Sequence, residues 1–323
     1  MFSKEDFISL ALELGFAKVG FCFPEPFDDA KQLVESQEPL SERKQLRFSP
    51  EDDFPDAKSI AVLLWPYLPA SIPQEGCVFV DSYYEASNAA YHAARLLEEK
   101  VLAHGCFAKA NVSYPAKTAA IRAGLGVIGR NSLLITPEYG SRVVIILMAT
   151  AFEIQSVRES VVSNPSCIGC GRCSSACPAK AITQEGMTHP ERCLRNFIME
   201  GIVVPEHFRT KIGMRMIGCD ICQRVCPMQP QMSQSDAYAY RLNDFITDNA
   251  ATFSDSVAKL AAQIGRNAAR PQRVRAQSAL LAGNSRNSAH LPVLKQWAQM
   301  PFDAVSEHAK WAICQITQET PDT

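Results

Sequence analysis

The first half of the chain alternates between two kinds of hydrophobic pattern. Apolar residues recur at helical spacing in two segments, 4–14 and 86–104. Short, almost uninterrupted apolar runs occupy three others, 17–23, 59–65 and 143–150. Such runs are typical of strands that are buried on both faces. Residues 1–155 are therefore predicted to form an α/β layer domain, and the pattern leaves the order of its strands open.

The last quarter of the chain has only the helical pattern. Amphipathic, Ala-rich stretches occupy four segments, 256–264, 273–281, 291–298 and 304–316. The sequence Ala-Gly-Asn-Ser at 282–285 indicates a break between two short helices. Short helix pairs of this kind are typical of α-solenoids, so residues 236–323 are predicted to form helical repeats.

Between these regions, residues 156–235 contain most of the cysteines of the chain. Eight of the 12 cysteines belong to this segment: Cys167, Cys170, Cys173, Cys177, Cys193, Cys219, Cys222 and Cys226. The first four have the spacing C-x-x-C-x-x-C-x-x-x-C-P, and the last three have the spacing C-x-x-C-x-x-x-C-P. This is the bacterial-ferredoxin pattern for two [4Fe–4S] clusters. The chain is thus predicted to have an α+β fold with a double-cluster module.

The spacing also predicts which cysteines share a cluster, because the cysteine before proline ligates the other cluster in two-cluster proteins. One cluster is expected to be held by Cys167, Cys170, Cys173 and Cys226, and the other by Cys177, Cys193, Cys219 and Cys222. Zinc is the alternative, but it prefers two separated C-x-x-C pairs. The remaining four cysteines, Cys22, Cys77, Cys106 and Cys314, are interpreted as small apolar side chains.

Composition restricts the setting in which these clusters work. The chain has 323 residues and a formal net charge of −2. Its longest apolar run, 143–152, is far below the roughly 20 residues that span a bilayer. The N-terminus is charged and has no secretory pattern. We expect a cytoplasmic protein with no membrane partner, in which cysteines serve metal ligation rather than disulfides.

Charge is distributed unevenly along the chain. From Ser256 to Phe302 there is no Asp or Glu, whereas the same stretch contains Lys259, Arg266, Arg270, Arg273, Arg275, Arg286 and Lys295. A solvated surface usually mixes both signs of charge. The asymmetry therefore favours an anionic partner, and RNA suits it better than a membrane because no large apolar face accompanies the cations. We expect Arg266, Arg270, Arg273, Arg275 and Arg286 to bind RNA.

A glycine-rich segment lies ahead of the cysteines. Residues 122–134 read RAGLGVIGRNSLL, which does not match a dinucleotide fingerprint or a P-loop. A tight turn is one interpretation. Close approach of the backbone to a large flat ligand is the other.

The order of these features resembles epoxyqueuosine reductase, within the wider group of cobalamin-dependent iron–sulfur reductases that includes reductive dehalogenases. The resemblance covers nearly the whole chain and includes the glycine loop, the cysteine spacing with the isolated Cys193, and the segments RVRAQSALLAGNS and SEHAKWAICQI, which are similar to HEAT-type repeats. It implies a monomeric enzyme of queuosine biosynthesis that takes electrons from a low-potential donor such as a ferredoxin or flavodoxin. Electrons would pass through both clusters to cobalamin, and the resulting Co(I) would reduce epoxyqueuosine in tRNA.

The resemblance also implies roles for individual residues. The loop residues Arg122, Ala123, Gly124, Leu125, Gly126, Ile128, Gly129, Arg130 and Asn131 are expected to line a cobalamin site over the N-terminal domain. The family carries an Asp ahead of this loop that is thought to protonate the opening epoxide, and Val112 replaces it here. Tyr114 and Lys117 are the candidate substitutes, with the pKa of Tyr114 expected to be lowered by Lys117.

Three other functions stay open on the sequence. The missing Asp favours a related corrinoid reductase that acts on another substrate. A protein that only delivers low-potential electrons to a partner needs the clusters but not the large N-terminal domain. An RNA-binding protein in which the clusters merely stabilise the fold is the third alternative.

Overall fold

The computed structural model describes residues 2–35, 47–155, 167–230 and 240–318. Its N-terminal lobe is built on an antiparallel four-stranded sheet in the order β1-β2-β7-β4. The strands are β1 (Lys18–Cys22), β2 (Ser59–Pro66), β7 (Val143–Thr150) and β4 (Ala108–Ala110). The three strands predicted from apolar runs are confirmed, and β2 and β7 form the centre of the sheet.

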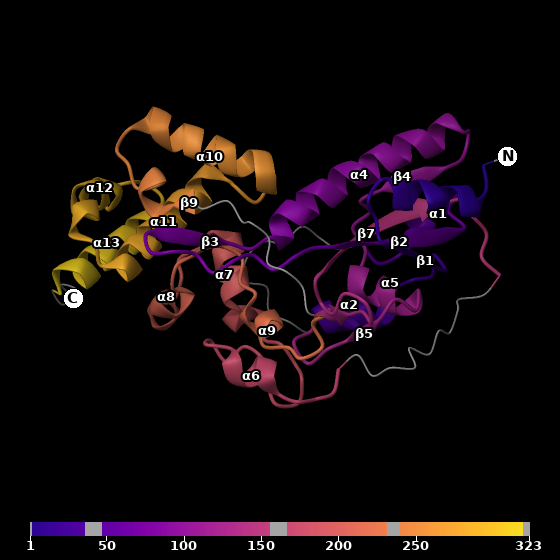
Figure 1. Cartoon of the computed structure of the whole chain (residues 1–323), viewed down its shortest axis with the longest axis horizontal. Coiled ribbons are helices and arrows are strands. Elements are labelled where there is room, and N and C mark those ends of the chain that lie inside the picture. The colour runs from indigo at the N-terminus through magenta and orange to yellow at the C-terminus, as the bar shows by residue number, and fades with distance from the viewer. Residues whose placement is uncertain (1, 36–46, 156–166, 231–239, 319–323) are drawn as a thin grey trace.

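Helices cover both faces of this sheet (Figure 1). Along β2, Ala61 and Leu63 pack against α1 (Lys4–Glu13) and α4 (Tyr83–Ala103). The alternate residues Ile60 and Val62 belong to a second core beneath α5 (Ala116–Arg122), beside α2 (Asp28–Glu35) and α3 (Pro50–Asp53). Because successive strand residues point to opposite faces, burial of both faces explains the uninterrupted apolar runs. The fold is mixed α/β in this region, and both predicted helices are confirmed.

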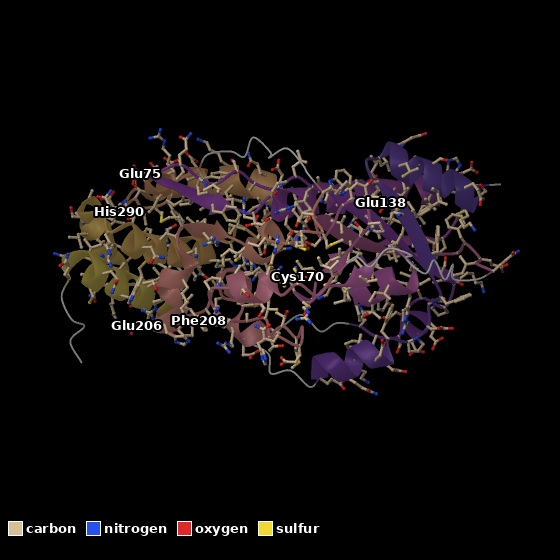
Figure 2. All side chains as sticks on the ribbon, turned by 60° about the horizontal axis from the view of Figure 1, so that its bottom comes forward. Glu75, Glu138, Cys170, Glu206, Phe208 and His290 are labelled. Atoms are coloured by element: carbon tan, nitrogen blue, oxygen red, sulfur yellow. The ribbon has the colours of Figure 1, made fainter. Side chains whose placement is uncertain are left out.

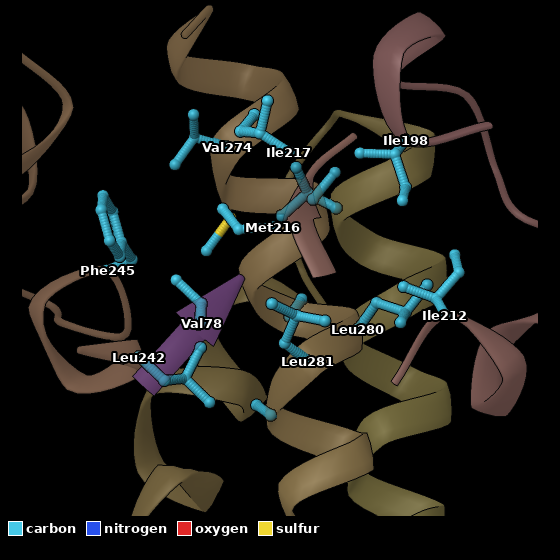
Figure 3. Close-up of a cluster of buried hydrophobic side chains, with 14 of the residues drawn as sticks. Val78, Ile198, Ile212, Met216, Ile217, Leu242, Phe245, Val274, Leu280 and Leu281 are labelled. Carbon is cyan, nitrogen blue, oxygen red and sulfur yellow. The ribbon is translucent and has the colours of Figure 1, made fainter. Parts of the chain in front are cut away.

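Strand β3 (Cys77–Val80) leaves this lobe and enters the other one. It pairs in parallel with β8 (Arg215–Ile217) and antiparallel with β9 (Tyr240–Arg241). Val78 packs there among Met216 and Leu281 (Figure 3). The second lobe therefore has one core, to which the N-terminal region contributes a strand.

The cysteine-rich segment lies in this second lobe as short elements joined by loops. They are α6 (Arg172–Ala176), η1 (Pro190–Arg192), α7 (Leu194–Glu200), α8 (Glu206–Ile212) and α9 (Ile221–Arg224). The short helix η2 (Leu242–Asp244) follows at the start of the tail. The hairpin of β5 (Val127–Ile128) and β6 (Leu134–Ile135) extends from the N-terminal lobe. The predicted boundary at 155/156 adjoins residues 156–166, and the predicted boundary at 235/236 falls within residues 231–239. Both segments lie outside the described residues.

The tail consists of helices, as predicted: α10 (Ala250–Ile264), α11 (Pro271–Ser285), η3 (Ser288–His290), α12 (Leu291–Trp297) and α13 (Asp303–Thr317). The expected break at 282–285 is wrong, because α11 continues to Ser285. A Cβ atom on Gly283 would lie 2.6 Å from the Trp311 ring. Gly283 therefore serves the close packing of α11 on α13 rather than a turn. A HEAT-type arrangement stays a prediction.

Among the described residues, no helix is both long and apolar enough to cross a membrane.

Candidate functional site

The first group of cysteines converges on one cavity. Cys167, Cys170, Cys173 and Cys226 all line it, together with Ile168 and Met228. Gly169 and Gly171 have φ values of 69° and 73°, a left-handed conformation that favours glycine and lets the loop curl around the cavity. Cys170 is exposed and lies near the middle of the long axis of the molecule (Figure 2). The structure thus brings together the four residues that spacing assigned to one cluster.

The second group lies deeper. Burial raises the pKa of the Cys222 thiol well above its usual range, and the neighbouring thiols of Cys219, Cys193 and Cys177 raise it further. These four cysteines are the second predicted set. The backbone N–H of Ala181 donates a hydrogen bond of 3.3 Å to the Cys177 sulfur, a contact that tunes cluster potentials when the sulfur is a ligand. Cys173 also acts on Cys222, so the two groups adjoin.

The chemistry of these thiols suits clusters. Burial disfavours a free thiolate, and a bound metal centre supplies the positive charge that stabilises it. Within the described parts of the chain, no three His, Cys, Asp or Glu side chains are close enough to hold a single metal ion. A cubane holds its four thiolates apart, around a cluster of iron and sulfide. The separation of these cysteine side chains is therefore compatible with a [4Fe–4S] cluster. For each of the eight cysteines, the role of cluster ligand stays a prediction.

The glycine loop folds onto itself. A Cβ atom on Gly126 would lie 2.4 Å from the Ile135 carbonyl oxygen, and one on Gly129 would lie 2.5 Å from the Ile135 side chain. Gly124 has a φ of 67° just after the end of α5. The tight-turn interpretation therefore accounts for these three glycines, because the hairpin requires them whether or not a ligand is bound.

The other loop residues face different surroundings. The Arg122 guanidinium donates to the Pro26 carbonyl at 2.9 Å and lies 4.3 Å from the centre of the Phe27 ring. Ala123 and Leu125 belong to the core under α5. Ile128 is 40% exposed at the hairpin.

The end of the loop reaches the cysteines. Arg130 and the buried Asn131 line the cavity of the first group, and Arg130 donates to the Gln184 carbonyl in the cysteine-rich segment. That the loop residues bind cobalamin stays a prediction.

Tyr114 does not have the surroundings that were expected. It is 3% exposed, and its hydroxyl donates a 2.7 Å hydrogen bond to Asp53, which is also paired with Arg47 at 2.7 Å. Burial and the bond to Asp53 raise the pKa of Tyr114 far above its usual range. The expectation that Lys117 lowers this pKa is therefore wrong.

Lys117 faces the glycine loop. Its ammonium donates a 2.7 Å hydrogen bond to the Ser132 carbonyl. Solvent reaches this side chain, yet the surrounding protein is dense enough that burial lowers its pKa, and the Arg195 cation lowers it further. Of the two predicted catalytic residues, Lys117 is the accessible one.

The five arginines of the tail do not form one uniform surface. Arg266, Arg270 and Arg286 are exposed. Arg275 lies 4.2 Å from the centre of the Phe253 ring and 5.6 Å from that of Trp297, as expected of a packing residue. Arg273 donates to the carbonyls of residues 267 and 268. RNA binding by this set stays a prediction.

A buried network of charges next to the second cysteine group escaped sequence analysis. Asp220 lies 2.8 Å from Arg224 and 3.5 Å from Arg142, and Asp81 from the N-terminal lobe faces the same group. Burial, and then repulsion by Asp220, raise the pKa of Asp81 to about 6. The acid between two cysteines in C-D-I-C was the available signal, whereas nothing in the sequence pointed to Arg142.

Comparison with known proteins gives a consistent result. Residues 166–229 match the model of a 4Fe-4S double cluster binding domain. Epoxyqueuosine reductase of Lactococcus garvieae is 32% identical over 244 residues, which are 69% of this chain and 69% of that protein. The Bacillus subtilis enzyme is 29% identical over 248 residues, 70% of this chain, which spans 63% of its length.

A solved structure has the same architecture. The crystal structure of an epoxyqueuosine reductase with a tRNA-Tyr epoxyqueuosine-modified stem loop matches with a TM-score of 0.77 at 25% identity. The match covers 97% of this chain and 90% of that one.

Proposed function

This chain belongs to the epoxyqueuosine reductase family, and from that membership we propose that it reduces epoxyqueuosine in tRNA to queuosine with the help of cobalamin. One observation carries the proposal. Two sets of four cysteines converge side by side on a scaffold that matches, over 97% of the chain, a reductase structure containing a modified tRNA stem loop. An enzyme of this kind is an oxidoreductase that resides in the cytoplasm.

We assign the first cavity to one [4Fe–4S] cluster and the buried group to the other. The donor sets suit this, because each offers four thiolates from loops that bring backbone N–H groups near sulfur. The exposed position of Cys170 makes the first cluster the entry point for an electron from a ferredoxin or flavodoxin. The second cluster, next to Arg195, would then deliver electrons to the reaction.

Cobalamin would lie against the hairpin between the two lobes. The residues there fit a flat and largely apolar ligand in one respect, since Ile128 turns an apolar side chain outward beside the end of the loop that reaches the cysteines. When bound, reduced cobalamin would supply the electron pair that opens the epoxide. We place its contacts at Ile128, Gly129 and Arg130, because Arg122, Ala123 and Leu125 are occupied elsewhere.

Lys117 is our candidate for the proton donor. Removal of an epoxide oxygen as water breaks both carbon–oxygen bonds, forms a carbon–carbon double bond and consumes two electrons and two protons. A general acid must donate near neutral pH, and burial moves the pKa of Lys117 in that direction. Val112 has no proton to give, and the Tyr114 hydroxyl is engaged with Asp53.

The decisive experiment combines anaerobic reconstitution with analysis of tRNA. Protein loaded with iron, sulfide and cobalamin should convert epoxyqueuosine in tRNA to queuosine under a low-potential reductant, as detected by mass spectrometry of nucleosides. The matched control is the same protein without cobalamin, which should leave epoxyqueuosine intact. Conversion that is independent of cobalamin, or none in loaded protein, would contradict the proposal.

Val112 favours a second candidate, a related corrinoid reductase with another substrate. In that case cobalamin binds and is reduced through the clusters, while epoxyqueuosine in tRNA persists in the same assay. A protein that takes up iron but not cobalamin would instead be an electron carrier.

A further inference from the structure

Four cations follow one another between the lobes. Lys117 lies on α5, Arg195 on α7, Arg273 on α11, and Arg270 directly before α11. The positive charge of Arg195 acts on Lys117 and on Arg273, and Arg270 acts on Arg273 as well. Figure 1 shows α7 between α5 and α11. A Cβ atom on Gly201, the residue that ends α7, would lie 3.3 Å from the Cβ atom of Arg273, so the end of α7 adjoins the tail. We call the four cations the cationic track.

Neutral groups, rather than carboxylates, hold three of these cations in place. Lys117 donates to the Ser132 carbonyl, Arg195 donates to the Tyr84 hydroxyl at 3.0 Å, and Arg273 donates to a carbonyl at 2.8 Å. In the part of the chain that the structure describes, no carboxylate lies within 4.0 Å of the four charged groups. A carbonyl or hydroxyl orients a cation without neutralising it, so the charge of the track persists.

The fold maintains this arrangement against two unfavourable effects. Neighbouring like charges repel each other, and burial lowers the pKa of both Lys117 and Arg273. Glu200 attracts Arg273, but more weakly than burial and Arg270 act on it. The Nε of Arg273 is buried without a hydrogen-bond partner among the described groups. A bound anion would offset both the repulsion between the cations and the effect of burial on them. Cations on a solvated surface would not require such an anion.

The arrangement of the track suits one class of anion. Its cations come from α5, α7 and the region of α11, and a nucleic-acid strand with a phosphate at every nucleotide presents charges in a row to such a set. We propose that the three arginines of the cationic track, Arg195, Arg270 and Arg273, bind the phosphodiester backbone of RNA, with Arg195 connecting the tail arginines to the site at Lys117. This rests on the proposed tRNA substrate, and it adds Arg195 to the predicted RNA-binding residues while narrowing the tail contacts to Arg270 and Arg273.

The test uses the full-length, cluster-loaded protein without cobalamin and an unmodified, fluorescently labelled RNA stem loop. Replacement of Arg195 or Arg273 by Gln should weaken binding about three- to tenfold and lower the slope of log K against log salt by about 1 per variant. Arg195→Lys and Arg273→Lys keep the charge and should largely retain the slope. Arg95→Gln is the matched control, because Arg95 is exposed on α4 about 16 Å along the helix from Tyr84.

A second measurement separates RNA from the phosphate of cobalamin. Optical titration with cobalamin and with cobinamide, which lacks the nucleotide-loop phosphate, should give the same affinities for Arg195→Gln as for the unaltered protein. Unchanged RNA affinity and salt slope in Arg195→Gln would overturn the proposal. So would a loss confined to cobalamin, which would assign the cation to the cofactor.

The outcome is independent of catalysis, because the RNA carries no epoxide. Normal RNA binding along the track in a protein that leaves epoxyqueuosine unreduced would refute the proposed function and leave this inference standing.

Discussion

The two cysteine groups each offer four thiols but have very different surroundings. The first group lies in a loop that ends at the surface, where Cys170 is exposed and Ile168 is 59% exposed. No cysteine of the second group is exposed, and Asp220 and Arg142 lie beside it at 2% and 4% side-chain exposure. Burial and nearby charge are what set cluster potentials. Ligand spacing thus defines a cluster, whereas the fold around it decides whether it meets a partner or the reaction.

Loss of a ligand should have the largest effect and should separate the two groups. Cys222→Ser and Cys170→Ser are each expected to remove about half of the bound iron and to abolish turnover. Only Cys222→Ser should also lower the melting temperature strongly, because its cluster lies within the buried group. Iron analysis, EPR and thermal unfolding test this. Equal melting temperatures for the two variants would contradict the difference in burial.

Replacement of Lys117 tests whether the reaction takes place beside the glycine loop. Lys117→Met should slow single-turnover reduction in cobalamin-loaded enzyme by about 100-fold or more, since general acids contribute about 10² to 10⁴ in rate. Iron and cobalamin contents should stay normal. The matched variant Lys117→Arg keeps the charge but donates a proton poorly, so it should be nearly as slow. A rate in Lys117→Arg close to that of the unaltered enzyme would assign Lys117 to charge alone.

Arg142 links the N-terminal lobe to the second group. Arg142→Met leaves Asp220 and Asp81 buried with less compensation, and we expect a loss of roughly 3–5 kcal/mol in the free energy of unfolding. Denaturant titration of the anaerobic protein measures it. Arg224→Met should cost less, because its side chain is 24% exposed. The opposite ranking would show that Arg142 is not the main partner of the buried acids.

The raised pKa of Asp81 predicts how the stability of the second lobe depends on pH. Its pKa is raised to about 6 in the folded protein, so its contribution to stability is fully present below its unfolded pKa and is lost as pH rises through about 6. Asp81→Asn should therefore remove a decline in stability between pH 4 and 7 that is on the order of 1–3 kcal/mol. Unfolding curves at several pH values check this. The same decline in the variant would assign it to another group.

Tyr114 should have the smallest effect on the reaction. Tyr114→Phe removes the hydroxyl bond to Asp53 and should cost about 1 kcal/mol of stability, with single-turnover reduction changed less than twofold. Stopped-flow measurement of the loaded variant tests it. A tenfold slower rate would restore Tyr114 as a proton donor.

Much of the architecture was readable from the chain because it depends on local spacing. The apolar runs at 59–65 and 143–150 became β2 and β7, and the cysteine spacing predicted which thiols the structure brings together. The break expected after residue 281 failed for a nonlocal reason. Gly283 permits close contact with Trp311, and no local rule distinguishes that glycine from one that ends a helix.

The candidate site was less accessible to sequence reasoning. Tyr114 and Lys117 are three residues apart, yet one binds Asp53, 61 positions away, and the other faces the glycine loop and Arg195. Arg195 carries no motif, and its importance follows only from its neighbours. Arg275 looked like the other tail arginines until its packing on Phe253 was visible.

Residue type at short spacing was enough to predict the helices, the central strands, the cysteine sets and the excess of positive charge in the tail. Folding was needed to reveal that β3 joins the second lobe, that Asp81 faces Asp220, and that the charge of Arg195 acts on both Lys117 and Arg273. Such contacts arise where segments far apart in the chain bury a common core. The burial of that core determines which charged groups come together, and these contacts cannot be predicted from residue spacing along the chain.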